Sequence, residues 1–215
     1  ITRSQKPQSL NQEFKLYFTL ADDHIFSFEA QHLDQEENPF SRAIRDRNPF
    51  TRLIPFSSSV NKYDVTQERL VQTAKLEAKL DYYYLLNDTS NINLSLGVTD
   101  VKQDFDSSFF QILDNGSLLN FNDPTFNNDV NFDFSDAYIA LNYRLRTGIF
   151  TIDPGLTLHY YKTKNTQLGT SFDRNISDVR PNLRINLQFK KSESLRLTYR
   201  KNTQFTDINN LAEGF

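Results

Sequence analysis

The sequence predicts an all-β protein: an antiparallel up-and-down transmembrane β-barrel segment of about eight strands. Apolar and polar residues alternate with a period of two along eight segments. Tight polar turns alternate with long connections between those segments. No run approaches the ~18 apolar residues of a membrane-spanning helix. A mean hydropathy of −0.59 fits a barrel, because every second residue of a barrel strand can face water.

The strands follow from the alternation. In the first, Phe14, Leu16 and Phe18 share one face, and the intervening residues are polar. A helix would carry charges all round its circumference in these segments, which excludes an amphipathic helix. The predicted strands include residues 14–20, 24–33, 74–86, 92–98, 139–145, 156–160, 183–189 and 195–199.

The connections indicate a membrane barrel. Short polar turns are expected at 21–23, 87–90, 146–148 and 191–194, and long irregular segments at 35–71, 106–136 and 165–178. Outer-membrane barrels have short turns on the periplasmic side and long loops outside. We therefore expect the four turns at one end of the sheet and the recognition loops at the other.

Prolines and tyrosines add local expectations. Pro154 is expected at a bulge near the periplasmic end, and Pro181 near the outer rim, because a proline inside a strand removes a ladder hydrogen bond. The tyrosines at 82–84 and 160–161 fit either interfacial girdles or ordinary strand residues.

Charged residues alternate with the apolar ones along the strands. Arg or Lys facing lipid costs ~2–4 kcal/mol at the midplane, so these side chains are expected to face the lumen. They would solvate the lumen and pair across strands or with a plug; selecting a ligand is the second possibility. The lumen-facing candidates are Lys75, Glu77, Lys79, Asp81, Arg144, Arg184, Arg196 and Arg200.

Several site classes find no support. The sequence has no cysteine, which excludes disulfides, thiolate metal sites and a cysteine nucleophile, and its net charge of −3 argues against a nucleic-acid partner. His24, His32 and His159 lack ligand spacing. The segment 129–136 starts like a calcium-binding EF-hand loop but fails the motif, leaving an irregular calcium site as a weak alternative to a solvated loop. We expect no catalytic residues, no metal and no cofactor, and hence no enzyme.

A family resemblance rests on several runs in order: Ala-Tyr-Ile-Ala-Leu-Asn-Tyr at 137–143, the turn at 146–148, and Phe-Thr-Ile-Asp-Pro-Gly-Leu at 150–156. The runs 181–187, 195–200 and 209–211 continue it, and 76–96 is similar to the preceding strand pair. Together they resemble the barrel of Bacteroidota TonB-dependent receptors. The chain departs from the family at Phe205–Thr206, where a Pro-Ser pair is usual.

The resemblance implies a nutrient importer of the bacterial outer membrane, with a 22-stranded barrel and an N-terminal plug. Its implied partners are outer-membrane lipid, the plug domain and TonB, and a surface lipoprotein. The implied ligand is a small molecule, glycan or peptide. Residues 1–215 contain neither a plug nor a signal peptide, so we expect them to be a partial barrel within a longer protein.

Two other functions stay open. The chain could be a small self-closed outer-membrane barrel or a soluble β-sandwich, acting as a binding or structural module through its loops. A barrel enzyme ranks last, because His32 and His159 have no nucleophile context.

Overall fold

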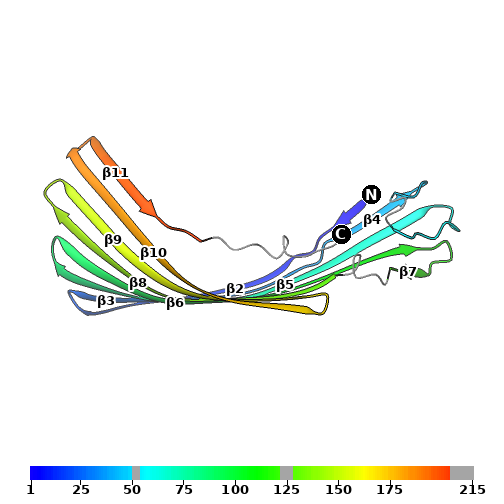
Figure 1. The fold of residues 1–215 in the computed structure, drawn as a ribbon, viewed down its shortest axis with the longest axis horizontal. Coiled ribbons are helices and arrows are strands. Elements are labelled where there is room, and N and C mark those ends of the chain that lie inside the picture. The colour runs from blue at the N-terminus through cyan, green and yellow to red at the C-terminus, as the bar shows by residue number, and fades with distance from the viewer. Residues whose placement is uncertain (50–53, 122–127, 204–215) are drawn as a thin grey trace.

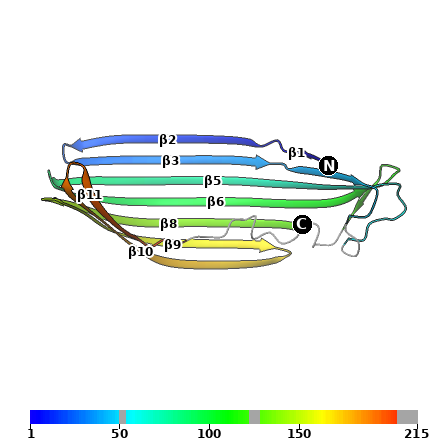
Figure 2. The same ribbon diagram turned by 90° about the horizontal axis from the view of Figure 1, so that it is seen from above.

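The computed structural model describes residues 1–49, 54–121 and 128–203, and these form one curved antiparallel sheet (Figures 1 and 2). Phe205–Thr206 and the run 209–211 lie outside the described residues. None of the described residues forms a helix long and apolar enough to cross a membrane. The strands are β1 (Thr2–Ser4), β2 (Gln8–Ala21), β3 (His24–Glu37), β4 (Phe40–Arg45), β5 (Tyr63–Asn87), β6 (Ser90–Ile112), β7 (Leu118–Asn120), β8 (Asn128–Thr147), β9 (Phe150–Gln167), β10 (Thr170–Lys190) and β11 (Glu193–Arg200).

Two prolines divide strands that are otherwise continuous. β3 and β4 lie along the same side of β5 in one register, interrupted at Asn38–Pro39. β1 and β2 share one register against β4 and β3, interrupted around Pro7. Proline has no backbone donor, which explains both breaks. The eight predicted strands are therefore confirmed as β2, β3, β5, β6, β8, β9, β10 and β11, each next to its chain neighbour.

The four short turns lie at one end of the sheet, as predicted (Figure 1, left). Backbone hydrogen bonds at this end link neighbouring hairpins to one another. Leu85 donates to Asp23 at 2.9 Å, Arg146 to Thr89 at 2.8 Å and Gln188 to Ile149 at 2.9 Å. Each bond joins one turn to the strand end beside it, so this end of the sheet is tightly tied.

The predicted long connections need correction. The segment 165–178 is not a loop: β9 and β10 meet in a tight hairpin at Leu168–Gly169, both with positive φ (50° and 74°), as two-residue hairpin turns require. The other two connections are shorter than predicted, because strands occupy much of 35–71 and 106–136. With 25 residues, β5 extends about 80 Å at ~3.3 Å per residue, far beyond the ~25 Å apolar band of a membrane barrel.

Pro154 does not form the predicted bulge. β8 and β9 keep the same register on both sides of it, but their ladder is interrupted between Asn142↔Gly155 and Leu145↔Ile152. Its pairing with Leu183 on β10 is intact. Pro181 lies where β11 ends, and its carbonyl accepts from the Lys201 backbone N–H at 3.3 Å. Both prolines therefore occur where a ladder is already incomplete.

One face of the sheet, the apolar face, carries rows of aliphatic and aromatic side chains. Leu80 and Leu96 stand opposite each other on β5 and β6 and are 39% and 45% exposed. They belong to a row that crosses seven strands: Leu16, Phe28, Leu80, Leu96, Ile139, Leu158 and Val179. A single sheet with such a face is the wall of a membrane barrel, since no second sheet among the described residues covers it.

The opposite, polar face is more crowded. Asp81 and Ser95, next along the chain to exposed residues of the apolar row, are only 4% and 5% exposed. Side chains converge on the concave side of a curved sheet, so the polar face is the concave one. The sheet is open, because β2 and β11 do not pair among the described residues. A self-closed barrel and a sandwich are both disfavoured.

Beyond the band the apolar side chains change face. On β5, Val65 and Val71 share the face of Lys75, and on β8 Val130 shares the face of Arg144. Phe105 and Val130 are buried there against Val71 and Phe132. A second cluster joins the loop between β4 and β5 to β5, β6 and the segment after β7: Ile54, Val65, Phe109 and Phe121, with Phe56 and Leu119. The outer end thus has its own apolar core on the inner side.

Candidate functional site

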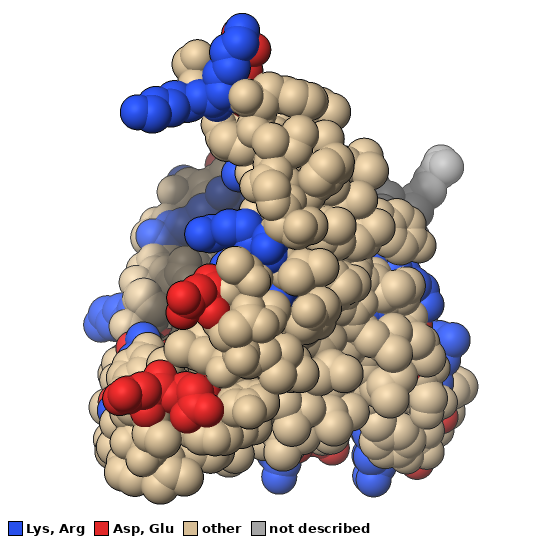
Figure 3. All heavy atoms as spheres, turned by 90° about the vertical axis from the view of Figure 1, so that its left-hand side faces the viewer, with Lys and Arg blue, Asp and Glu red and all other residues tan. Residues whose placement is uncertain are grey.

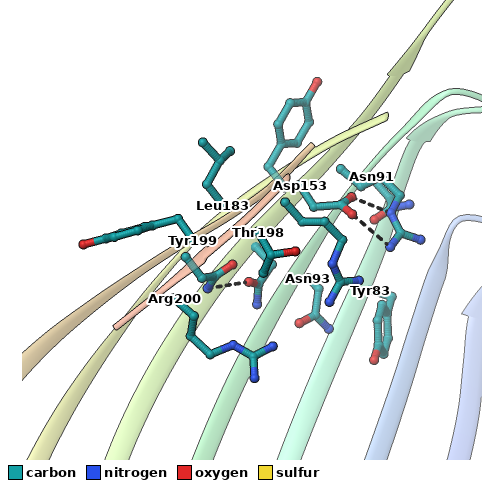
Figure 4. Close-up of a pocket in the computed structure, with 13 residues that line it drawn as sticks. Tyr83, Asn91, Asn93, Asp153, Leu183, Thr198, Tyr199 and Arg200 are labelled. Carbon is teal, nitrogen blue, oxygen red and sulfur yellow. Dashed lines mark hydrogen bonds and ion pairs between the residues drawn. The ribbon is translucent and has the colours of Figure 1, made fainter. Parts of the chain in front are cut away.

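One cavity, toward the short-turn end, opens on the polar face, with a volume of about 250 Å³. β5, β6, β8, β9, β10 and β11 all contribute to it (Figure 4). In Figure 4, Arg200, Asn93 and Tyr83 leave one side of the sheet, whereas Leu183 and Tyr199 leave the other. The residues around it are Tyr83, Asn91, Asn93, Asn142, Tyr143, Arg144, Asp153, Asn182, Leu183, Arg184, Thr198, Tyr199 and Arg200.

A row of amides crosses the cavity. Asn93 pairs with Asn142, which pairs with Gly155, which pairs with Asn182. A Cβ on Gly155 would overlap Asn142 Oδ1 and Asn182 Nδ2, so the glycine leaves room for these amides to meet over its backbone. Asn182 Nδ2 donates to Asn142 Oδ1 at 3.5 Å.

An ion pair bridges the gap in the β8–β9 ladder. Arg144 Nε donates to Asp153 Oδ1 at 2.6 Å, and Nη2 to Oδ2 at 3.4 Å. The pair spans the interval beside Pro154 where the two backbones do not bond. Charge-assisted bonding here replaces part of the lost ladder.

Two arginines of the cavity differ from Arg144. The side chains of Arg184 and Arg200 form no hydrogen bond or ion pair with any residue that the structure describes. Asn93 Nδ2 is buried and has no hydrogen-bond partner, while its Oδ1 accepts from Ser95 Oγ at 3.1 Å. Two guanidinium groups with no partner among the described residues therefore line one cavity.

The predicted lumen-facing residues all fall on the polar face. The structure pairs Lys75 with Glu77 at 2.8 Å and Lys79 with Asp81 at 2.7 Å along β5. Ser95 also donates to Asp81. Arg144, Arg184 and Arg200 gather at the cavity, and Arg196 lies nearer the β10–β11 turn, opposite Asn186. The predicted set thus divides into a paired group on β5 and an arginine-rich group on β8, β10 and β11.

Figure 3 views the molecule from the short-turn end, where Lys and Arg side chains lie in and beside a hollow. Toward the short-turn end, five arginines lie on the polar face of β8, β10 and β11: Arg144, Arg146, Arg184, Arg196 and Arg200. The only carboxylate among the residues around the cavity is Asp153. This part of the polar face is strongly basic, although the whole chain carries a net charge of −3.

Sequence reasoning missed a second polar group, farther from the turns. His159 Nδ1 lies 2.9 Å from Asp136 Oδ1, and the His159 ring stacks on Tyr161 with centroids 5.1 Å apart. The Arg180 guanidinium lies over Tyr161, 5.3 Å from its centroid. These residues come from β8, β9 and β10, so no motif along the chain could have joined them.

Asp178 is a further missed residue. It accepts from Lys201 Nζ at 2.5 Å, Thr203 Oγ1 at 2.5 Å and Arg180 Nε at 3.0 Å. The bonds from Lys201 and Thr203 hold the segment after β11 against β10, where the backbone ladder of β11 has ended.

The segment 129–136 is not the solvated loop that its polar residues suggested. It lies within β8, with Asp129, Asn131, Asp133 and Ser135 alternating with Val130, Phe132 and Phe134. The described residues hold no group of three or more His, Cys, Asp or Glu side chains that could bind a metal. The alternation that resembled a calcium loop is that of a strand beyond the apolar band.

A scan against protein-family models and a search of curated proteins found no match. Solved structures are similar to the sheet. BauA, the ferric preacinetobactin receptor from Acinetobacter baumannii, has a TM-score of 0.58 at 12% identity, over 90% of this chain and 30% of that one. The open form of Fiu, the ferric-catecholate import receptor of E. coli K12, has 0.59 at 10%, over 92% and 35%. The ferric citrate transporter FecA has 0.55 at 13%, over 89% and 26%.

The chain has the fold of an outer-membrane receptor barrel. The identities are too low to show more than the fold, and the chain spans about a quarter to a third of the length of these structures. An open sheet is what part of a larger barrel would show. The fold class predicted from the alternation, a transmembrane up-and-down barrel segment, is confirmed.

Proposed function

We propose that the chain forms part of the wall of a TonB-dependent importer in the bacterial outer membrane. The observation that carries this proposal is the two-faced sheet: an exposed apolar face opposite a concave face lined by ion pairs and amides. A water-filled or plugged barrel needs this division between lipid and lumen. The similar structures support it: a ferric citrate transporter, a ferric preacinetobactin receptor and a ferric-catecholate import receptor.

The partners, the ligand class and the lumen-facing residues of this importer are proposed from the sequence runs that resemble Bacteroidota receptors. The partners would be outer-membrane lipid, a plug domain and TonB, and a surface lipoprotein above the long strands. The imported ligand would be a small molecule, glycan or peptide. The lumen-facing residues would be the eight charged candidates of β5, β8, β10 and β11.

Cysteine labelling tests the orientation. The sequence contains no cysteine, so a cysteine at Leu80 or at Lys79 is unique within it. In the parent protein, in outer membranes, Cys at Leu80 should react with a lipid-soluble maleimide and resist a charged one. Cys at Lys79 should react with the charged reagent once the barrel interior is open to water. Equal reactivity at both positions would contradict the two-faced wall.

A growth experiment tests transport. A strain without the parent gene and a strain without TonB are compared on iron chelates, glycans and peptides as limiting nutrients. We expect both strains to lose growth on the same nutrient and to recover with the corresponding gene restored. Uptake that persists without TonB, or a protein that does not fractionate with the outer membrane, would overturn the proposal.

A further inference from the structure

We propose that Arg184 and Arg200 bind an oxyanion, a carboxylate or a phosphate group, in the cavity on the polar face. The site deepens the proposed function, since it rests on the polar face being the inside of the barrel. It adds a binding preference at the short-turn end, which the fold alone does not imply.

The first argument is charge. Asp153 is engaged by Arg144, so it does not neutralise the remaining arginines of the cavity. Arg146 lies at another cavity by the turns, together with Asp22, Asp23 and Asp88. Asp178 is engaged by Lys201 and Arg180. The excess positive charge is therefore concentrated at Arg184 and Arg200.

The second argument is geometry. Arg184 stands opposite Thr198, and Arg200 opposite Asn182, which makes the two arginines diagonal neighbours on β10 and β11. Diagonal neighbours on one face lie about 7–8 Å apart, a separation that an oxyanion accepting from two guanidinium groups can bridge. Without an anion the two like charges repel each other.

The third argument is the kind of hydrogen-bonding group. Asn93 projects from the same side of the sheet as Arg200, and both line the cavity (Figure 4). The guanidinium groups of Arg184 and Arg200 donate hydrogen bonds and accept none, so they favour an anion and disfavour a cation.

The size of the cavity limits the ligand. Its volume of about 250 Å³ is below the ~300–1,000 Å³ of sites for drug-sized molecules. Its remaining lining includes amides and hydroxyls, such as Asn142, Asn182 and Thr198, which hydrogen-bond to oxygen without adding charge. The bound group is thus a single small oxyanion, either on a free solute or on an acidic side chain inside the barrel.

The test uses the intact parent barrel, extracted from outer membranes in detergent, with inorganic phosphate as the probe. Phosphate binding is measured by calorimetric titration, and the midpoint of unfolding is followed by the heat-modifiable gel band, both at constant ionic strength. The proteins compared are wild type, Arg184→Gln, Arg200→Gln and the control Arg196→Gln. Arg196 lies on the same face of β11 but outside the cavity. A free-anion site predicts phosphate binding that each of the first two variants weakens roughly tenfold or more, and the control leaves unchanged.

A carboxylate of the barrel's own interior gives a different result. Phosphate then has no effect on wild type, but Arg184→Gln and Arg200→Gln lower the unfolding midpoint more than Arg196→Gln does. The proposal is overturned if phosphate has no effect and the three variants unfold alike, or if phosphate binds both cavity variants as it binds wild type. Nutrient uptake by strains that carry the same variants separates the anion site from the proposed transport role. If import is normal but neither phosphate binding nor the difference in unfolding midpoint is observed, the anion site is rejected and the transport role is retained.

Discussion

Arg144 and Asp153 join β8 and β9 side chain to side chain, at 2.6 Å, across an interval where the two backbones share no ladder. The interval coincides with Pro154, whose nitrogen cannot donate. The ion pair therefore has a definable structural role: it holds two neighbouring strands together where the usual bonds between them are missing.

Replacing Asp153 with Asn should loosen this junction. Arg144 is about half exposed, so solvent screens the pair, and we expect a loss of about 1 kcal/mol in the free energy of unfolding. The measurement is urea-induced unfolding of the parent barrel in lipid vesicles. Asp173→Asn, at an exposed position of β10, is the control. Exchanging the charges, Arg144→Asp with Asp153→Arg, should restore much of the loss; no recovery would show that the pair is not the cause.

The two faces should respond differently to a new charge on β6. Leu96→Arg places a guanidinium in the middle of the apolar row and should cost ~2–4 kcal/mol of folding free energy. Thr99→Arg places it on the polar face, opposite Glu77 and Asp136, and should cost little. The readout is the amount of heat-modifiable folded protein in the outer membrane. Equal losses from both variants would contradict the assignment of the faces.

Gly155→Ala should disturb the amide row. The added methyl overlaps the Asn142 and Asn182 side chains, which must move, and overpacking of this kind costs roughly 1–3 kcal/mol. Combining it with Asn142→Ala should recover part of the stability, because the added methyl then meets one amide fewer. Unfolding midpoints of the single and double variants measure the coupling, and strict additivity would count against the contact.

Glu36 should make the outer end sensitive to acid. Hydrogen bonds from Asn38 and Gln72 lower the pKa of its carboxyl below the usual value. A carboxyl with a depressed folded-state pKa stabilises the fold above its unfolded pKa, and the contribution is lost as the pH falls through the folded value. Exchange of the amides near Pro39, expressed relative to the intrinsic exchange rate at each pH, should therefore rise as the pH falls below the ordinary carboxyl pKa in wild type. In Glu36→Gln this rise should be smaller; an identical rise would exclude Glu36 as its source.

Gln111 should control the loop between β4 and β5. Its buried amide accepts from the Ser57 backbone N–H at 2.8 Å and donates to the Ser57 carbonyl at 3.2 Å. Gln111→Ala leaves both backbone groups without this partner, at a cost of roughly 1–3 kcal/mol. We expect faster proteolysis of the loop with the barrel still folded. Gln103→Ala, which removes a bond to Thr73 on the same face, should leave the loop protected.

The sequence predicted the part of the fold that contacts lipid. Alternation is strong where one face meets hydrocarbon, as in the strand from Ala74 to Leu86, and there the strand and its faces were confirmed. The alternation fails at the β9–β10 hairpin. There the positions that continue the apolar face carry polar residues, Lys162 and Lys164 on β9 and Asp173 and Asn175 on β10. Beyond the membrane no solvent difference imposes a period of two, so the sequence predicts a loop where these strands continue.

The candidate site was only partly predictable. The charges of Arg144, Arg184 and Arg200 stood out because they alternate with apolar residues within their strands. Asn93, Asn142 and Asn182 did not, since a neutral amide on a strand has no distinctive pattern. Their convergence depends on the register of four strands, β6, β8, β9 and β10, which a single sequence does not specify.

The reversal of the apolar face along β5, β6 and β8 also sets the depth at which the wall sits in the bilayer. Just outside the band, on the lipid-facing side, the row that contains Leu76 continues through Asp100, Ser135 and Lys162. Sinking the wall by one such row would bring an aspartate and a lysine into hydrocarbon, and rising would expose the rows nearest the short turns to water. Both displacements cost free energy, so the placement of these side chains along the strands fixes the depth of the wall in the bilayer.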